Sequence, residues 1–171
     1  MVDRRSLLLA ATSAALAGCG KASPSGRGED PNGGIDRETE RRGDIEIVQG
    51  LLALEHQSAG LYAKETGRLF RRLEAHERDH AARLEQALAR RGAKPRDAGW
   101  MVSGNGLGLA RKVEETAIAA YLDAMPKVVD DALRGVLASI VAVEAGHLAE
   151  VRRALGLVAA NQSFVTGRRS L

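Results

Sequence analysis

The stretch LFRRLEAHERDHAARLEQAL, residues 69–88, predicts a helix whose buried face is not purely apolar. Its four leucines share one helical face, as on the inner side of an amphipathic helix. Glu77 and His80 occupy two further positions of that same face. Residues three apart project from one side of a helix, so both side chains should point into the protein core.

Three other segments, 44–66, 105–125 and 130–155, show the same helical periodicity, and no segment shows an extended strand-like alternation. Glycine or proline separates the four segments, as expected at helix ends, and Asp44 is expected to cap the first of them. Only 3% of the residues are aromatic, which also argues against a protein rich in strands. Helices of this size would be about 30 to 40 Å long. The chain is therefore predicted to be all-α, a four-helix bundle.

The apolar inner faces of the other three predicted helices also carry ionisable residues. Glu55 lies in the first, Glu114 in the third, and Glu144 with His147 in the fourth as a second Glu-x-x-His. Unpaired ionised carboxylates in an apolar core would cost several kcal/mol each. Two divalent or trivalent metal ions would neutralise them. The alternative is pairing of the carboxylates with His and Arg side chains.

The two halves of the predicted bundle also repeat the same spacing between a glutamate and a tyrosine. Tyr62 follows Glu55 by seven residues, and Tyr121 follows Glu114 by seven. This repeat favours Glu114 over its neighbour Glu115 as the inward-facing residue. For both tyrosines we favour core packing, with a hydrogen bond to a metal ligand or radical formation as the alternatives.

One glutamate from each of two helices, with a Glu-x-x-His from each of the other two, resembles the ligand set of ferritin-like di-iron carboxylate proteins. The stretch HERDHA, residues 76–81, is also similar to bacterial exported ferritin-like proteins. The resemblance implies a ferritin-like four-helix bundle over 44–157, with a long loop between its second and third helices. Residues 92–105 could extend over about 45 Å, enough to run the length of the bundle. Length alone does not distinguish this crossover from a simple up-and-down path.

The resemblance also implies roles for the six residues. The bridging carboxylates would be Glu77 and Glu144, the terminal carboxylates Glu55 and Glu114, and the nitrogen ligands His80 and His147. His56 and His76 flank these ligands and are expected to point away from the metals. The implied cofactor is two metal ions, iron in the first place, with manganese or zinc as alternatives.

The first residues indicate export. Arg4 and Arg5 precede an apolar run, residues 7–17, that is too short to span a bilayer as a helix. The run leads into LAGC, residues 16–19, which resembles the lipobox of bacterial lipoproteins. The paired arginines resemble a twin-arginine signal in which Leu7 stands where such signals often carry Phe.

Residues 1–18 are accordingly predicted to be a lipoprotein signal peptide. Cys19 would then carry a diacylglyceryl group that anchors the mature protein to a bacterial membrane in the cell envelope. Residues 19–43, rich in glycine and charge, are expected to form a flexible linker, and residues 158–171 a C-terminal tail. Membrane lipid is thus an expected partner.

The composition excludes other classes of protein. A single cysteine rules out an internal disulfide and a cysteine-rich metal site. The net charge of +3, with arginines spread along the chain and few aromatics, argues against a nucleic-acid partner. The sequence leaves a homodimer open.

Two functional classes follow from the sequence. The first is a redox metalloprotein of ferroxidase or peroxidase type, with oxygen, peroxide or ferrous iron as its substrate. The second is a non-enzymatic envelope scaffold, or a partner-binding bundle, whose metal site is structural or vestigial. The residue pattern by itself does not choose between an enzyme and a scaffold.

Overall fold

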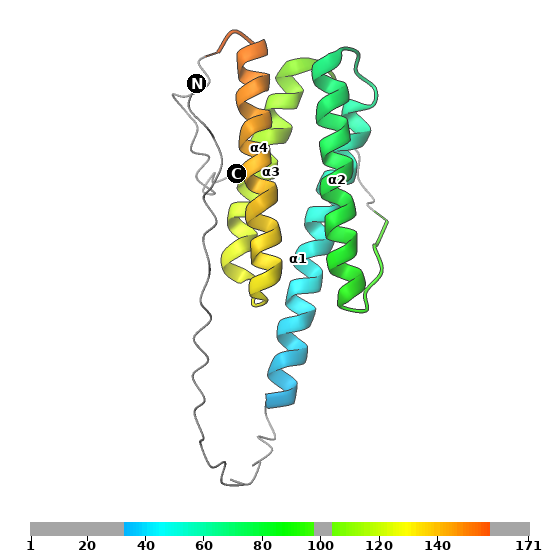
Figure 1. Cartoon of the computed structure of the whole chain (residues 1–171), viewed down its shortest axis with the longest axis vertical. Coiled ribbons are helices and arrows are strands. Elements are labelled where there is room, and N and C mark those ends of the chain that lie inside the picture. Colours follow the sequence, from blue (N-terminus) through cyan, green and yellow to red (C-terminus); the bar gives the residue numbers. More distant parts are fainter. Residues whose placement is uncertain (1–32, 98–103, 158–171) are drawn as a thin grey trace, which may run out of the picture. The chain divides into compact units, whose positions relative to one another are not determined.

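Four helices make up the part of the chain that the computed structural model describes, residues 33–97 and 104–157. They are α1 (Gly33–Tyr62), α2 (Arg68–Arg90), α3 (Gly106–Ala124) and α4 (Asp131–Ala154), with one 3-10 turn at Met125–Lys127 (Figure 1). None of these described residues forms a strand, so the predicted all-α bundle is confirmed. The predicted signal peptide, Cys19 and the tail at 158–171 lie outside the described residues.

The path of the chain includes a long crossover between α2 and α3. At one end of the bundle, the backbone N–H of Gly106 at the start of α3 donates to Glu65 Oε1, in the turn that follows α1 (2.6 Å). At the opposite end Arg91, just after α2, pairs with Asp130, just before α4 (2.5 Å). Helices α2 and α3 therefore run parallel, so that α2 ends at one end of the bundle and α3 begins at the other (Figure 1).

The described start of this crossover is held against α1. The Gln49 side-chain amide donates to the carbonyl of Lys94 (2.7 Å) and accepts from the N–H of Arg96 (2.9 Å). One side chain thus satisfies two backbone groups that belong to no helix. The long loop between the second and third helices, which the family resemblance implied, is confirmed.

Helix α1 begins earlier than the sequence predicts, and the predicted linker 19–43 is wrong for residues 33–43, which are helical. No residue from 37 to 43 is buried, so this part of the helix has no apolar periodicity to reveal it. Charge pairs at helical spacing support it instead, because Glu38 binds Arg41 (2.8 Å) and Arg42 (3.1 Å).

Asp44 is correspondingly not the cap of the first helix. It lies within α1 with its side chain buried, and its carboxylate accepts from the backbone N–H groups of Val129 (2.9 Å) and Asp130 (3.1 Å). Asp130 is in turn the N-cap of α4, because its side chain accepts from the N–H of Leu133 (2.9 Å). The Asp44 carboxylate therefore fixes the start of α4 against α1.

The apolar core divides into two clusters, one toward each end of the bundle. The first packs the early part of α1 and α4 against the late part of α2 and α3, and its members include Leu52, Leu84, Leu88, Leu137 and Ile140. The second packs the opposite helix halves, and its members include Leu61, Phe70, Leu73, Val113 and Val151. The middle level of every helix is left between these two clusters.

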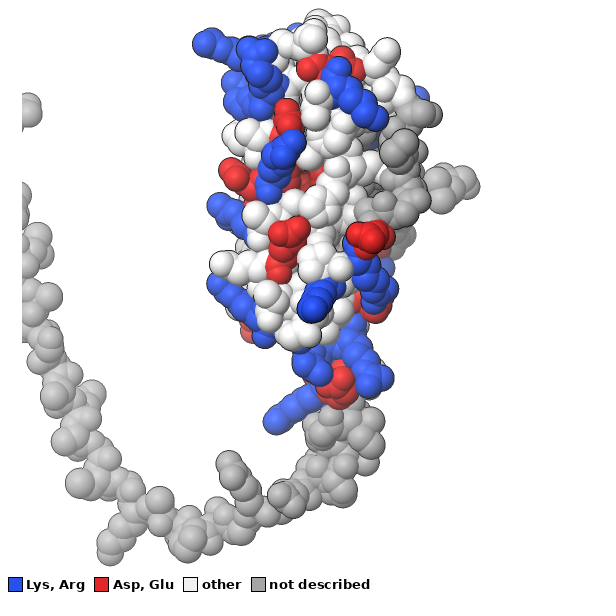
Figure 2. Space-filling model, turned by 90° about the vertical axis from the view of Figure 1, so that its right-hand side faces the viewer, with Lys and Arg blue, Asp and Glu red and all other residues white. Residues whose placement is uncertain are grey.

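The surface is mixed in charge, and basic and acidic side chains are interspersed on the face shown in Figure 2. By length and composition alone, one of the described helices, α4, is apolar enough to cross a membrane, with a mean hydropathy of 1.4 over its best window. A helix in the core of a helical bundle can meet the same criteria of length and hydropathy. Helix α4 carries Glu144 and His147 on the side that faces the other helices, which fits a place in the bundle.

Candidate metal centre

A layer of buried ionisable side chains separates the two apolar clusters. Helices α1 and α3 contribute one carboxylate each, and α2 and α4 contribute a carboxylate and an imidazole each. None of the six residues is more than 4% exposed; they are Glu55, Glu77, His80, Glu114, Glu144 and His147. Glu115, the alternative to Glu114, instead pairs with Arg111 on the same helix (3.0 Å). Helical periodicity therefore identified the inward-facing residues of this layer.

The first of two overlapping groups surrounds His80. Glu55, Glu77, His80 and Glu144 each offer one ligand atom, and these atoms all lie within 4.8 Å of one another. His80 Nδ1 lies 2.7 Å from Glu144 Oε1, 3.6 Å from Glu55 Oε2 and 3.8 Å from Glu77 Oε2. Three helices thus bring one imidazole nitrogen and three carboxylate oxygens to a single point.

The second group surrounds His147 and shares two carboxylates with the first. Its members are Glu77, Glu114, Glu144 and His147, again with ligand atoms within 4.8 Å of one another. His147 Nδ1 lies 3.2 Å from both Glu77 Oε1 and Glu144 Oε2, and 3.6 Å from Glu114 Oε2. Glu77 and Glu144 therefore each turn one oxygen toward His80 and the other toward His147, an arrangement in which each could contribute an oxygen to both groups.

Several atoms of this layer have no hydrogen-bond partner. Among the described residues, the buried unpaired side-chain atoms are Glu55 Oε2, Glu77 Oε1, His80 Nδ1, Glu114 Oε2 and Glu144 Oε1. They approach one another at ion-pair distances without hydrogen-bond angles. Buried polar atoms left in this way are destabilising, and a cation bound where they converge would satisfy them. Carboxylate oxygens and imidazole nitrogens are also the donors that divalent iron, manganese and zinc accept. The residues present therefore fit metal ions.

The two tyrosines bind the carboxylates that belong to only one group, Glu55 and Glu114, here called the outer carboxylates. Glu77 and Glu144, which belong to both groups, are the shared carboxylates. The Tyr62 hydroxyl donates to Glu114 Oε1, and the Tyr121 hydroxyl donates to Glu55 Oε1, in both cases between α1 and α3. Each outer carboxylate thus keeps one oxygen on a tyrosine and presents the other to a histidine. The favoured expectation of core packing alone was wrong for both tyrosines. Burial, reinforced by the adjacent carboxylates, raises the pKa of both hydroxyls, so they remain protonated donors.

Comparison of the sequence with known protein families gives a match. The profile of the ferritin-like domain matches residues 43–157, more than half of the chain. The chain belongs to the ferritin-like domain family. No curated protein matches it significantly. The matched region contains all of α2, α3 and α4 and most of α1, and hence all six residues of the buried layer.

Protons can balance part of the charge in this ferritin-like domain when no metal is bound. Burial raises the pKa of Glu55 to about 8, so this carboxyl is mainly protonated at pH 7, and burial also raises the pKa of Glu114 well above its usual value. Burial lowers the pKa of an imidazole, but the facing carboxylates outweigh it here. They raise the pKa of His80 to about 11 and that of His147 to about 12.

The two shared carboxylates behave in the opposite way. Burial by itself would raise their pKa values, but the attraction of the two facing imidazoles outweighs it. The pKa of Glu77 is therefore lowered, and that of Glu144 falls to about 2. At pH 7 two imidazolium charges then face two ionised carboxylates, and these four charges cancel. Two divalent ions with all six residues deprotonated would likewise leave no net charge.

His76 belongs to the site, although the sequence predicted that it points away. Its Nδ1 lies 2.8 Å from His147 Nε2, and the two rings stack with centroids 5.1 Å apart. With His147 Nδ1 directed at a metal, its Nε2 carries the proton and donates to His76, which fixes the tautomer and the ring. His76 is half-buried at the edge of the helical face, so periodicity carried no signal for it. His56 does point away, toward Glu85 at the surface (3.3 Å).

The charge balance makes metal binding depend on pH. Because the ligands must lose their protons, binding of two divalent ions at pH 7 should release protons from both imidazoliums and from Glu55. The sign follows directly: raising the pH removes competing protons, so affinity should increase with pH, through the region around pH 8 where Glu55 ionises. Calorimetry in buffers of different ionisation enthalpy counts the protons. Binding without proton release would contradict the assignment.

His76 should contribute to metal affinity through His147. His76→Ala removes the acceptor for the Nε2 proton and should weaken binding about 10- to 100-fold, the usual effect of losing such a partner. His76→Asn keeps an acceptor near the same position and should restore much of the affinity. Competition against a chelator of known affinity measures both variants.

His56→Ala is the matched control, since it removes a histidine next to a ligand on α1 that makes only a surface contact. Its metal affinity should equal that of the unmodified protein. Equal losses in the His56 and His76 variants would show that His76 has no specific role.

Proposed function

We propose that the bundle holds a dinuclear metal centre, most readily of iron, that acts on oxygen, peroxide or ferrous iron. One observation supports this above all others. Glu77 and Glu144 each direct one oxygen to the His80 group and the other to the His147 group. Two ion-binding points that share two carboxylates would hold two ions side by side, as in a dinuclear centre.

The protein residues would leave room for a substrate at each ion. Each point offers one imidazole nitrogen, one outer carboxylate oxygen and one oxygen from each shared carboxylate, which makes four protein donors. Iron and manganese commonly accept six donors, whereas structural zinc prefers four with sulfur or nitrogen. When bound, a redox-active pair supplies electrons to, or accepts them from, a small molecule at the open positions.

The surrounding side chains orient the ligands of the two ion-binding points. Tyr62 and Tyr121 each hold one oxygen of an outer carboxylate, so that the other oxygen is directed inward. The apolar clusters above and below exclude water from the layer, which strengthens every electrostatic interaction inside it. His76 orients the ring of His147.

A scaffold function remains the second candidate, supported by the charge balance described above. Because protons on the imidazoles and on Glu55 offset part of the charge of the layer, the bundle can bury these residues without metal. In that case the centre would be structural or vestigial, and the surface rather than the interior would carry the function.

Ferrous iron separates the two candidates. The purified chain, stripped of metal and reconstituted without oxygen, should bind two ferrous ions per chain, and added peroxide or oxygen should oxidise them. Elemental analysis and absorption spectroscopy provide the stoichiometry and the oxidation. A chain that binds two ions but never oxidises them would support the scaffold.

Paired variants test the residues responsible. Glu77→Ala with Glu144→Ala should abolish stoichiometric binding, since both points lose an oxygen. Glu74→Ala with Glu150→Ala removes carboxylates from the same two helices, where they pair with Arg78 and Arg72 toward the solvent. This control should retain two ions. Equal loss in both double variants would refute the site.

We also propose that the protein is exported and held on a bacterial membrane by lipid on Cys19. The support is the sequence at Arg4–Arg5 and at residues 16–19. A diacyl anchor binds a membrane far more firmly than a single acyl chain. Cys19→Ser should therefore move the protein from the membrane fraction to the soluble envelope fraction, as immunoblotting of fractionated cells would show. Unchanged membrane association of this variant would contradict the anchor.

A further inference from the structure

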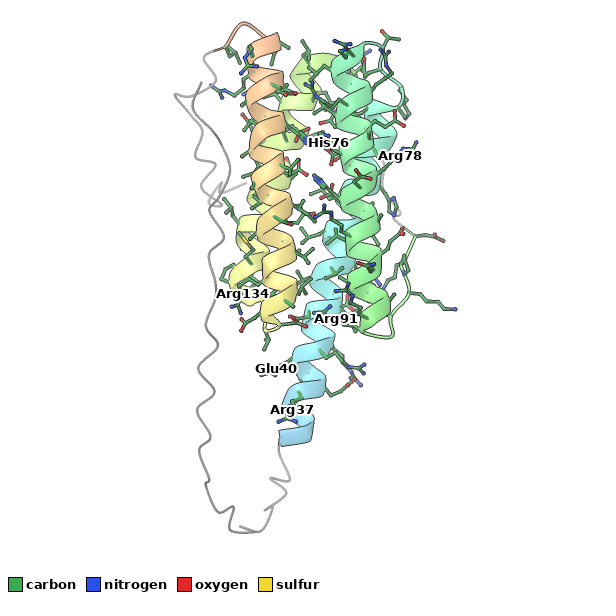
Figure 3. The ribbon with its side chains drawn as sticks, viewed as in Figure 1. Arg37, Glu40, His76, Arg78, Arg91 and Arg134 are labelled. Atoms are coloured by element: carbon green, nitrogen blue, oxygen red, sulfur yellow. The ribbon has the colours of Figure 1, made fainter. Side chains whose placement is uncertain are left out.

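A pocket of about 170 Å³ opens on the seam between α2 and α4, beside the ionisable layer. Its α2 side is lined by His76, Asp79, His80 and Arg83, and its α4 side includes Val143. In Figure 3 His76 lies between these two helices. The pocket is therefore placed on the side of the bundle where the two Glu-x-x-His helices meet.

The floor of the pocket adjoins the candidate centre. His80 and Ile140 both line it and are almost fully buried. His80 Nδ1 faces the carboxylates of the first group, at 2.7 Å from Glu144 Oε1. A single imidazole ring thus separates the pocket from the first ion-binding point. His76 lines the same pocket and contacts His147, so the pocket adjoins a residue of each group.

The rim of the pocket carries unpaired charges. Asp79 and Arg83 are four residues apart on α2, a spacing that often produces an ion pair. Within the described residues, however, the structure contains no ion pair or hydrogen bond from either side chain, whereas Glu74 and Arg78 on the same helix do pair (2.7 Å). Both the guanidinium and the carboxylate are therefore free to contact a molecule in the pocket.

The size of the pocket limits what it can hold. Pockets that bind drug-sized ligands have volumes of about 300–1,000 Å³, and one liquid water occupies about 30 Å³. A volume near 170 Å³ therefore accommodates several waters or one small molecule of a few non-hydrogen atoms, but not a drug-sized organic cofactor.

We propose that this pocket is the site through which a small polar ligand of peroxide size reaches the metal centre. The inference rests on the proposed function, because it requires metal to be bound. It adds a location for the ligand and excludes drug-sized molecules: the ligand approaches between α2 and α4, on the His80 side, past Arg83 and Asp79 at the rim. Hydrogen peroxide has the required size and both donates and accepts hydrogen bonds, which matches a rim with one cation and one anion.

Azide is a suitable probe, because it has three heavy atoms and produces an absorption band when it binds oxidised iron. The iron content of each protein is measured first, and the iron-loaded, oxidised protein is then titrated with azide. Val143→Phe should fill the pocket and weaken azide binding by about tenfold or more, with two ions still bound per chain. Arg83→Met should weaken it by a smaller factor, since it removes the rim cation.

Leu122→Phe is the matched control. Leu122 lies on α3 outside the pocket, and its side chain has the same 38% exposure as that of Val143. This variant should bind azide like the unmodified protein. If Val143→Phe does not fold, Ser139→Phe narrows the same pocket from one turn away on α4, with Ala138→Phe as its neighbour outside the lining.

The outcomes distinguish the two proposals. Two bound ions with azide binding weakened only in the pocket variants would support the pocket as the route. Two bound ions with azide affinity unchanged in a folded pocket variant would overturn the pocket and leave the dinuclear centre intact. Absence of bound iron in the unmodified protein would overturn the proposed function, and the pocket assignment with it.

Discussion

The constraint on which this structure depends is the burial of four carboxylates at the middle of an apolar bundle. Such groups are tolerated only with compensating positive charge or protons. Every helix has to bring its ionisable residue to the same level, because each carboxylate needs the imidazoles of α2 and α4 within a few ångströms. The apolar side chains are consequently divided into a cluster on either side of this layer. Protons or metal ions can fill the same role with the same total charge.

The layer is symmetric in its ligands and asymmetric in its surroundings. Two Glu-x-x-His helices and two tyrosine-bearing helices reproduce each other's contacts, down to which oxygen of Glu55 or Glu114 a tyrosine holds. Outside this core the likeness ends. The residue before Glu77 on α2 is His76, which contacts the ring of His147. The residue before Glu144 on α4 is Val143, which lines the pocket. His76 therefore contacts a histidine of the centre, whereas Val143 places an apolar side chain in the pocket that both residues line.

Sequence reasoning succeeded where a local rule applied and failed where a distant partner decides. Helical periodicity located all six buried residues and the bounds of α2, α3 and α4 closely, because the period follows from backbone geometry. It missed the first turns of α1, which are exposed and supported by the Glu38 charge pairs. It also took Asp44 for a cap, although the groups that this carboxylate binds lie 85 and 86 residues further along the chain. His76 was misplaced for the same reason, since its partner is on another helix.

The sequence by itself determined the helical class, the inward faces and the identity of the ionisable layer, since these depend on spacings within single helices. Only the tertiary structure decided the crossover between α2 and α3, because a loop of that length permits either path until Gly106 and Glu65 meet at one end and Arg91 and Asp130 at the other. Packing likewise decided which oxygen of each carboxylate faces which histidine, and where the layer adjoins a pocket. Those features arise between helices, where spacing along the chain carries no information about distance.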